Sequence, residues 1–429
     1  MQQTSMPADS GPVFAALADA PRVRDLVSAA AWAARSQVGG VPPGRGAPGA
    51  SIVDAGRSMG TDAAMTHSWL ITGAPGSGRT EVARAFAAAL ECTDPQRPGC
   101  GQCAACQAVL ARAHTDVVEI APEGLSISVE TVREEIVGRA ETLPTVGSWR
   151  VVIVHDADRL SPAAADALLK TVEEPAPRTV LFFCAPSTDP EDFSVTLRSR
   201  CRHIYVPPPS VDRIVRILTS EEGASEPDAR LAALASLRHI GRARRLVTRP
   251  EMQRRRARVL RLAELIGHGD VAFREAGQLF QAIKSETADD FADADAEEKA
   301  VLERSLGMGG RGKGVQKSLR GSAGAVRDLE KQQKRRKTRR ERDLLDLSLV
   351  DLTGLYRDAF LLSCGARLAP THPDFQGLAQ ELATSVSPQG LVACLDAIAL
   401  CRRHITQNVG LSIAVDGMIG RLRLAYGVR

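Results

Sequence analysis

The sequence predicts an α/β domain with a five-stranded parallel sheet and helices on both faces, followed by a small helical lid and an all-α C-terminal domain. Three observations support this. Short apolar runs alternate with amphipathic stretches from His67 to Val206, as in βαβ units. Most of the runs are continuously apolar, which is typical of strands covered on both faces. After the prolines at 207–209, the pattern is helical only.

The composition is that of an ordinary globular protein. Of 429 residues, 44% are hydrophobic and 25% are charged, and the length suggests about three domains. We expect neither a membrane span nor a secretory signal, because the sequence has no run of about 18 apolar residues and no basic region before an apolar run at its start. Aromatic residues make up only 4%, which argues against stacking platforms for single-stranded nucleic acid.

The elements are expected in a regular order. A helix at 13–36 comes first. A helix capped by Ser128 follows the second strand, and another begins at Ser161-Pro162 and ends before Pro175. Beyond about Arg254 the chain is expected to be helical, interrupted by a Gly-rich basic stretch at 307–342. The expected strands are 68–72, 116–120, 150–155, 179–185 and 202–206, and two lid helices are expected at 211–218 and 230–237.

These patterns divide the chain into three predicted domains. The α/β domain spans 1–208 and carries a flexible insertion at 38–66. The lid spans 209–250, and the C-terminal helical domain spans 251–429.

A glycine-rich loop follows the first strand and opens a helix. Its sequence, Gly73-Ala-Pro-Gly76-Ser-Gly78-Arg79-Thr80, has the layout of a phosphate-binding P-loop. Backbone N–H groups of such a loop bind phosphate oxygens, and Thr80 would hold Mg²⁺. Arg79 stands where the motif has Lys, and a planar guanidinium does not substitute simply for a compact ammonium. The loop is therefore expected to be either a degenerate ATP/Mg²⁺ site or a glycine-rich turn kept for packing.

The acidic residues that a P-loop enzyme needs are incomplete. An Asp-Glu pair would follow the third strand, where this chain has His155-Asp156. Asp156 and Asp158 could reach a metal, but a glutamate to orient water is missing from this position. The sequence therefore predicts impaired ATP hydrolysis.

Four cysteines lie within fifteen residues after the P-loop helix. Cys92, Cys100, Cys103 and Cys106 are spaced as ligands of a structural, tetrahedral Zn²⁺ that closes the insert 92–106. An iron–sulfur cluster and unligated thiols are the alternatives. We expect the remaining five cysteines to be core residues.

The positive charge is concentrated in one segment. The formal net charge is +4, but residues 311–342 contain 13 Lys and Arg against 3 Asp and Glu. This segment could contact phosphate backbones or form a solvated helix face.

Taken together, these motifs resemble the clamp-loader branch of the AAA+ family, and within it the delta-prime type of subunit of bacterial DNA polymerase III. The resemblance is strong over 14–209 and moderate to about 249. It rests on GAPGSGRT with the four-cysteine insert, HTD at 114–116, ADALLKTVEEPAP at 165–177 and LRSRC at 197–201.

The resemblance implies roles for two arginines. Arg200, in the Ser-Arg-Cys motif, would act in trans as an arginine finger on the ATP of a neighbouring subunit. Arg244 would be the nucleotide-sensing arginine of the lid. For each, a surface arginine without such a role is the alternative.

The resemblance also implies partners and a setting. The C-terminal domain would be the collar that joins motor and delta subunits in a pentameric ring, which places the sliding clamp on primed DNA. The protein would be cytoplasmic, associated with the nucleoid and replisome, in a complex with ATPase and DNA-directed DNA polymerase activity. We expect this chain not to hydrolyse ATP on its own. A self-sufficient AAA+ ATPase of the motor type and a zinc-dependent DNA-binding protein are the alternative functions.

Overall fold

The computed structural model describes residues 11–39, 65–122, 124–306, 315–407 and 409–428. It contains two compact units, one of Met1–Pro122 with Ser126–Ser210 and one of Glu123–Leu125 with Val211–Arg429. The expected flexible insertion at 38–66 lies almost entirely outside the described residues. The division into three domains, with boundaries after 208 and 250, stays a prediction.

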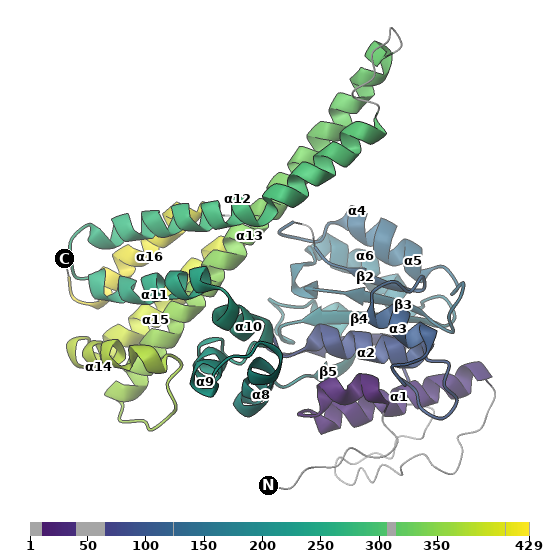
Figure 1. Cartoon of the computed structure of the whole chain (residues 1–429), viewed down its shortest axis with the longest axis horizontal. Coiled ribbons are helices and arrows are strands. Elements are labelled where there is room, and N and C mark those ends of the chain that lie inside the picture. Colours follow the sequence, from purple (N-terminus) through teal and green to yellow (C-terminus); the bar gives the residue numbers. More distant parts are fainter. Residues whose placement is uncertain (1–10, 40–64, 123, 307–314, 408, 429) are drawn as a thin grey trace. The chain divides into compact units, whose positions relative to one another are not determined.

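The first unit is built on a five-stranded, fully parallel sheet (Figure 1), which confirms the predicted fold class. Its spatial order is β2-β3-β4-β1-β5, so β2 and β5 are the two edge strands. The register pairs Leu70 with Phe183 and Val152 with Leu181. The strands are β1 (Ser68–Thr72), β2 (Val117–Ile120), β3 (Arg150–Val154), β4 (Thr179–Ala185) and β5 (Arg202–Tyr205).

Helical segments cover both faces of this sheet. The expected helix at 13–36 is divided, because Pro21 starts a new helix after a short 3-10 segment. Ser128 and Ser161 cap their helices as expected, each accepting a hydrogen bond from a backbone N–H. The segments are η1 (Pro12–Leu17), α1 (Pro21–Gly39), α2 (Arg79–Glu91), α3 (Ala104–Leu110), α4 (Val129–Thr131), the π-helical η3 (Val132–Val137), α5 (Gly138–Ala140), η4 (Ala157–Arg159), α6 (Pro162–Glu173) and α7 (Val195–Arg198).

Alternate residues of each central strand enter different cores. Trp69 and Ile71 pack in one core with Phe86 of α2, whereas Leu70 packs in the other with Leu168 of α6. All of these side chains are buried. Burial on both faces is the reason that the middle residues of the central strands are apolar, whereas polar residues such as Ser68 and Thr179 stand at the strand ends.

The second unit is helical throughout its described residues. A small core joins α8, α9 and α10, and a larger one joins the helices that follow. No single described helix has the length and apolar composition needed to cross a membrane, although the bent pair Pro373–Ser385 and Pro388–Thr406 meets this criterion when taken together. The helices are α8 (Val211–Glu221), α9 (Glu226–Ala235), α10 (Ile240–Thr248), α11 (Pro250–Leu265), α12 (Val271–Ser305), α13 (Val315–Ser363), η5 (Pro373–Phe375), α14 (Gln376–Ser385), α15 (Pro388–Thr406) and α16 (Leu411–Ala425).

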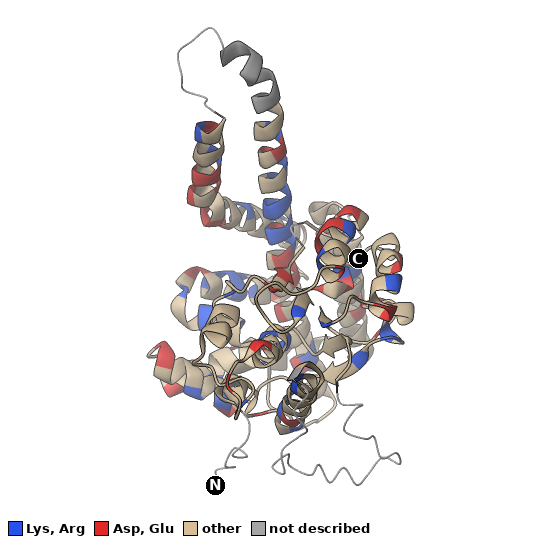
Figure 2. Ribbon diagram, turned by 90° about the vertical axis from the view of Figure 1, so that its right-hand side faces the viewer, with Lys and Arg blue, Asp and Glu red and all other residues tan. Residues whose placement is uncertain are grey.

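Helices α12 and α13 form a long hairpin, with acidic residues along α12 facing basic residues along α13 (Figure 2). The expectation that a glycine-rich stretch interrupts the helices is wrong from Val315 onward, because α13 is continuous to Ser363. That sequence contains no proline. Asp295 of α12 pairs with Arg336 and with Lys337, at 2.5 and 2.6 Å. The hairpin therefore neutralises part of its own basic segment.

Candidate functional site: a glycine-rich loop and a four-cysteine group

The glycine-rich loop joins the carboxyl end of β1 to the start of α2, in the middle of the sheet. Gly76 and Gly78 have φ angles of 82° and 93°, which L-residues with a side chain rarely adopt. Ligands of parallel α/β sheets bind at this edge, and the N-terminus of a helix favours an anion. The structure therefore brings the predicted residues Gly73, Gly76, Gly78, Arg79 and Thr80 into a P-loop arrangement.

Arg79 folds back onto the loop itself. Its Nη1 donates a hydrogen bond of 2.7 Å to the carbonyl oxygen of Gly73. The lysine of a P-loop reaches the β- and γ-phosphates of a nucleotide instead. Arg79 is thus occupied by a backbone acceptor and would have to rotate to bind phosphate.

The hydroxyl of Thr80 is engaged by a histidine. Thr80 Oγ1 lies 3.1 Å from Nδ1 of His155, and Nε2 of His155 lies 3.0 Å from Oε2 of Glu119. A carboxylate only accepts hydrogen bonds, so His155 donates from Nε2 to Glu119, and its Nδ1 faces the hydroxyl of Thr80. His155 therefore takes the position next to Thr80 at which a P-loop enzyme has a metal-binding aspartate.

Glu119 does not supply the missing negative charge. Arg84 of α2 holds its carboxylate with two hydrogen bonds of 2.7 and 2.9 Å. Burial opposes ionisation of Glu119, but the hydrogen bonds from Arg84 and His155 outweigh it and lower the pKa of Glu119 to about 2. The Glu119 charge is thus present and already paired with Arg84. Sequence reasoning missed both residues, which lie 35 positions apart.

The aspartates after His155 are placed close to each other. Asp156 has a left-handed backbone, with a φ angle of 45°. Burial, and then the charge of Asp156, raise the pKa of Asp158 above its usual value. The negative charge of Asp156 thus disfavours ionisation of its neighbour Asp158.

Two other buried carboxylates shape the loop before β3. Asp116 accepts backbone hydrogen bonds from residues 145–147, and Glu91 accepts two from residues 148 and 149. Burial raises the pKa of Glu91 to about 7, whereas backbone hydrogen bonds outweigh burial and lower the pKa of Asp116. Asp116 of the His-Thr-Asp motif thus holds a loop in place.

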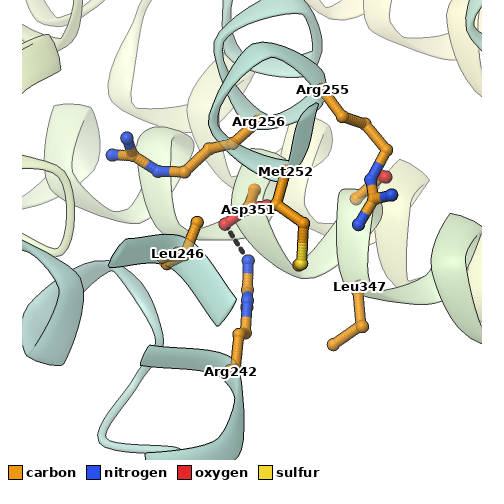
Figure 3. A pocket seen from close by; sticks show the side chains of 8 residues that line it. Arg242, Leu246, Met252, Arg255, Arg256, Leu347 and Asp351 are labelled. Carbon is orange, nitrogen blue, oxygen red and sulfur yellow. Dashed lines mark hydrogen bonds and ion pairs between the residues drawn. The ribbon is translucent and has the colours of Figure 1, made fainter. Parts of the chain in front are cut away.

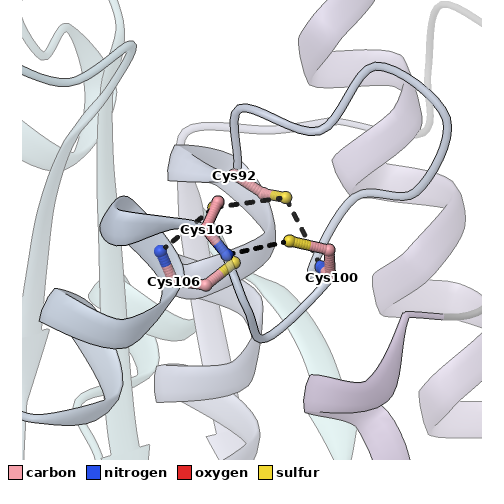
Figure 4. A group of neighbouring side chains, drawn as sticks. All are labelled: Cys92, Cys100, Cys103 and Cys106. Atoms are coloured by element: carbon pink, nitrogen blue, oxygen red, sulfur yellow. Dashed lines mark hydrogen bonds between the residues drawn. The ribbon is translucent and has the colours of Figure 1, made fainter.

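The four predicted cysteines converge beside the end of α2 (Figure 4), with all four sulfurs within 4.8 Å of one another. A tetrahedral metal with bonds of about 2.3 Å would place sulfur atoms about 3.8 Å apart, so the group fits a metal ion. Cys100, Cys103 and Cys106 each donate a backbone N–H to the sulfur of another member, at 3.3 to 3.4 Å. Such donors stabilise thiolates. Arg35 of α1 supports the insert by donating to the carbonyl of Cys92, at 2.6 Å.

Arg200 lies on the surface just before the edge strand β5. Its side chain is 37% exposed and is paired with Glu173, the last residue of α6. It also donates to the carbonyl of Thr196, at 2.9 Å. An arginine at the sheet edge is accessible to a neighbouring molecule, and Glu173 holds it in a defined position.

Arg244 lies in the second unit, on α10. It pairs with two carboxylates, those of Glu221, the last residue of α8, and of Glu222, which follows it. Within the unit, this predicted sensor arginine links α10 to the end of α8.

The first unit contains a region that is similar to known proteins. Residues 52–210 match a family model described as "DNA polymerase III, delta subunit". The DNA polymerase III subunit delta' of Escherichia coli K12 is 41% identical over 171 residues, which cover 39% of this chain and 50% of the relative. The region of this chain that matches is delta-prime-like. The resemblance that its motifs predicted is thereby confirmed.

Two further relatives match a similar share of the chain. The delta' subunit of Pseudomonas aeruginosa PAO1 is 35% identical over 170 residues, covering 38% of this chain and 51% of the relative. The gamma/tau subunit of Mycobacterium tuberculosis H37Rv is 34% identical over 191 residues, covering 43% and 31%. The chain spans about half the length of the delta-prime relatives that it matches.

Proposed function

We propose that this chain is a delta-prime-like subunit of the bacterial replicative clamp loader, within the DNA polymerase III holoenzyme. It helps to load the sliding clamp on primed DNA and does not hydrolyse ATP itself. The 41% identity to a delta' subunit supports the type of subunit. The observation that carries the absence of hydrolysis is the hydrogen bond between Thr80 and His155.

ATP hydrolysis depends on the negatively charged groups that lie beside the P-loop. A magnesium–nucleotide site needs an aspartate beside the P-loop hydroxyl and a residue that orients water. Here an imidazole occupies the first position, and the carboxylate that contacts it, that of Glu119, is paired with Arg84. The glycine-rich loop keeps its backbone donors, so nucleotide binding can persist while turnover is lost.

The proposed catalytic contribution is made in trans. Arg200 is exposed at the sheet edge, where it can meet the nucleotide of an adjacent subunit and stabilise charge that develops on the γ-phosphate. Glu173 would hold the guanidinium ready and release it on contact with the more highly charged nucleotide. Arg244, which is already held by two carboxylates, would have a structural role in the lid.

The proposed metal is structural Zn²⁺ bound by Cys92, Cys100, Cys103 and Cys106. Four soft thiolates fill the tetrahedral shell, so no position is left for substrate. The metal would close the insert 92–106, whose buried members in the core are Cys92 and Cys106. We expect it to contribute to folding and not to chemistry.

The proposed partners are motor and delta subunits joined with this chain in a pentameric ring, together with the sliding clamp and primed DNA. The similarity to relatives named delta' and gamma/tau supports a place among such subunits. A cytoplasmic, replisome-associated location follows from this proposal.

Reconstitution tests the proposal. Motor and delta subunits from the same organism are mixed with or without this chain, and loading of the labelled clamp on primed DNA is followed. We expect efficient loading only when the chain is present, and a single complex that contains it in gel filtration. Equal loading without the chain, or failure to join the complex, would overturn the proposal. Robust ATP turnover by the chain alone would favour a self-sufficient motor instead.

A further inference from the structure

A cluster of arginines lies where α10, α11 and α13 approach one another in the second unit. Arg242 and Arg245 lie one turn apart on α10, and Arg249 follows at its C-terminal end. Burial, and then the charges of the surrounding arginines, lower the pKa of Arg245. The neighbours that repel it are Arg340, Arg249, Arg255 and Arg242.

Four of these five arginines have a carboxylate partner. Arg242 pairs with Asp351 and Arg255 pairs with Glu286. Arg249 and Arg340 share one carboxylate, that of Asp290, at 3.8 and 2.9 Å. Five cations therefore face three carboxylates, and the cluster keeps a local charge of +2.

Arg245 is the member left without a partner. Within the described part of the chain, its guanidinium has neither an ion pair nor a hydrogen bond, and its Nε is enclosed by protein atoms. Arginines in the neighbouring interior are held firmly, as Figure 3 shows for Arg242 and Asp351. A partly buried cation without an acceptor is unfavourable, so a partner from outside the chain would be stabilising here.

The partner must approach from the solvent side. The internal pocket beside Arg242 and Arg255 has a volume of about 10 Å³, enough for a single water molecule. Arg245 itself is only half-buried. Its planar group matches the oxygens of a phosphate with two parallel hydrogen bonds.

We propose that Arg245, with Arg249 and Arg340 beside it, forms a binding site for a phosphate group. The same chemistry is offered by free phosphate and by the backbone of a nucleic acid. Three more arginines of α11 are exposed and unpaired in the described structure, and they recur at i, i+4 and i+7 over roughly 10 Å. They are Arg254, Arg258 and Arg261. These arginines add exposed positive charge to the helix that also carries Arg255, which favours the extended polyanion over the single ion.

The inference does not rest on the proposed function, and it differs from what the sequence alone indicated. The basic run that begins at Lys331 is partly neutralised by α12 (Figure 2). The proposed site instead lies around Arg245 of α10, close to Arg340 near the end of that run.

The test uses the full chain and two variants that each remove one charge. Arg245→Gln removes the proposed ligand, and Arg421→Gln removes an exposed arginine of α16 as the matched control. Binding of a fluorescent DNA duplex is titrated at several salt concentrations. The unfolding temperature is measured by circular dichroism in sodium phosphate and in sodium chloride of equal ionic strength.

We expect Arg245→Gln to weaken duplex binding about tenfold and to reduce the slope of log K against log salt by about 1. We expect phosphate to stabilise the wild-type chain more than chloride does, and to lose this advantage in Arg245→Gln. Loss of the phosphate effect alone assigns the site to free phosphate, and loss of duplex binding identifies the backbone.

Three results would overturn the site: unchanged behaviour of Arg245→Gln with both probes, equal losses in Arg421→Gln, or a lower unfolding temperature of Arg245→Gln in chloride. The last result would mean that Arg245 has a structural role. Because Arg245 is repelled by its neighbours, we expect this variant to unfold at the same or a higher temperature. Arg245→Lys, which keeps the charge without the planar fork, should fall between wild type and Arg245→Gln.

Discussion

Replacing Glu119 by glutamine tests the network that occupies the P-loop hydroxyl. The side chain of Glu119 is only 12% exposed, and Arg84 and His155 hold it in its charged form. Lowering its pKa from 4.5 to about 2 corresponds to about 3 kcal/mol of folding free energy at neutral pH. Glu119→Gln should lose about this amount, because it also leaves Arg84 without its partner.

The lowered pKa of Glu119 makes the stability of the first unit depend on pH. A carboxyl with a lowered folded-state pKa stabilises the protein fully above the unfolded value of 4.5, and the stabilisation is lost as the pH falls towards 2. The difference between wild type and Glu119→Gln should therefore shrink from about 3 kcal/mol at pH 7 to about 1.4 kcal/mol at pH 3.

Tryptophan fluorescence is the appropriate assay in urea titrations. The three tryptophans, Trp32, Trp69 and Trp149, all lie in the first unit and report on its unfolding alone. Glu135→Gln, at an exposed position of the same unit, is the matched control and should change little. A loss below about 1 kcal/mol at pH 7, or a difference that does not vary with pH, would refute the account of this network.

Three further predictions concern other parts of the chain. Cys103→Ser should reduce the zinc content, measured by mass spectrometry, from about one ion per chain to near zero, and it should lower the urea midpoint detected by tryptophan fluorescence. The control Cys364→Ser, at an exposed position, should retain the metal. Zinc retention in Cys103→Ser would contradict the site. Burial, and then the charge of Arg256, lower the pKa of His372 to about 3. The stability of the second unit should therefore fall as the pH drops below about 6.5, by about 1.4 kcal/mol per pH unit from this group. His372→Gln should flatten this dependence of stability on pH, measured by circular dichroism. An unchanged slope in this variant would exclude His372 as the source. Asp295→Asn should destabilise the helical hairpin by about 1 to 3 kcal/mol, because Arg336 and Lys337 lose a buried partner. The control Asp293→Asn, at an exposed position, should leave the stability unchanged. Equal effects of the two variants in urea titrations would argue against the pairing.

The strands could be predicted closely from the sequence. Those at 68–72 and 179–185 have the expected bounds, because burial on both faces makes the residues within each strand apolar and the run stands out in the sequence. The P-loop and the cysteine group were also visible, since each depends on residue types at a fixed local spacing.

Contacts between distant elements could not be predicted in this way. The pairing of Arg84 with Glu119 depends on how α2 packs against β2, and either residue alone is an ordinary polar residue of its element. The continuity of α13 was missed for a related reason. Its basic run is unfavourable in isolation and is compensated by acidic residues of α12 such as Asp295. Charge compensation across a hairpin has no local signal in the sequence.

The most direct test of the central claim is the ATPase rate of the reconstituted clamp loader that contains this chain, either wild type or Arg200→Ala. Arg198→Ala, at an exposed position two residues earlier, is the control. We expect the chain alone to show no turnover, and we expect Arg200→Ala to lower the rate of the complex at least tenfold, about 1.4 kcal/mol in barrier, without preventing assembly. An unchanged rate with Arg200→Ala, or ATP turnover by the isolated chain, would contradict it.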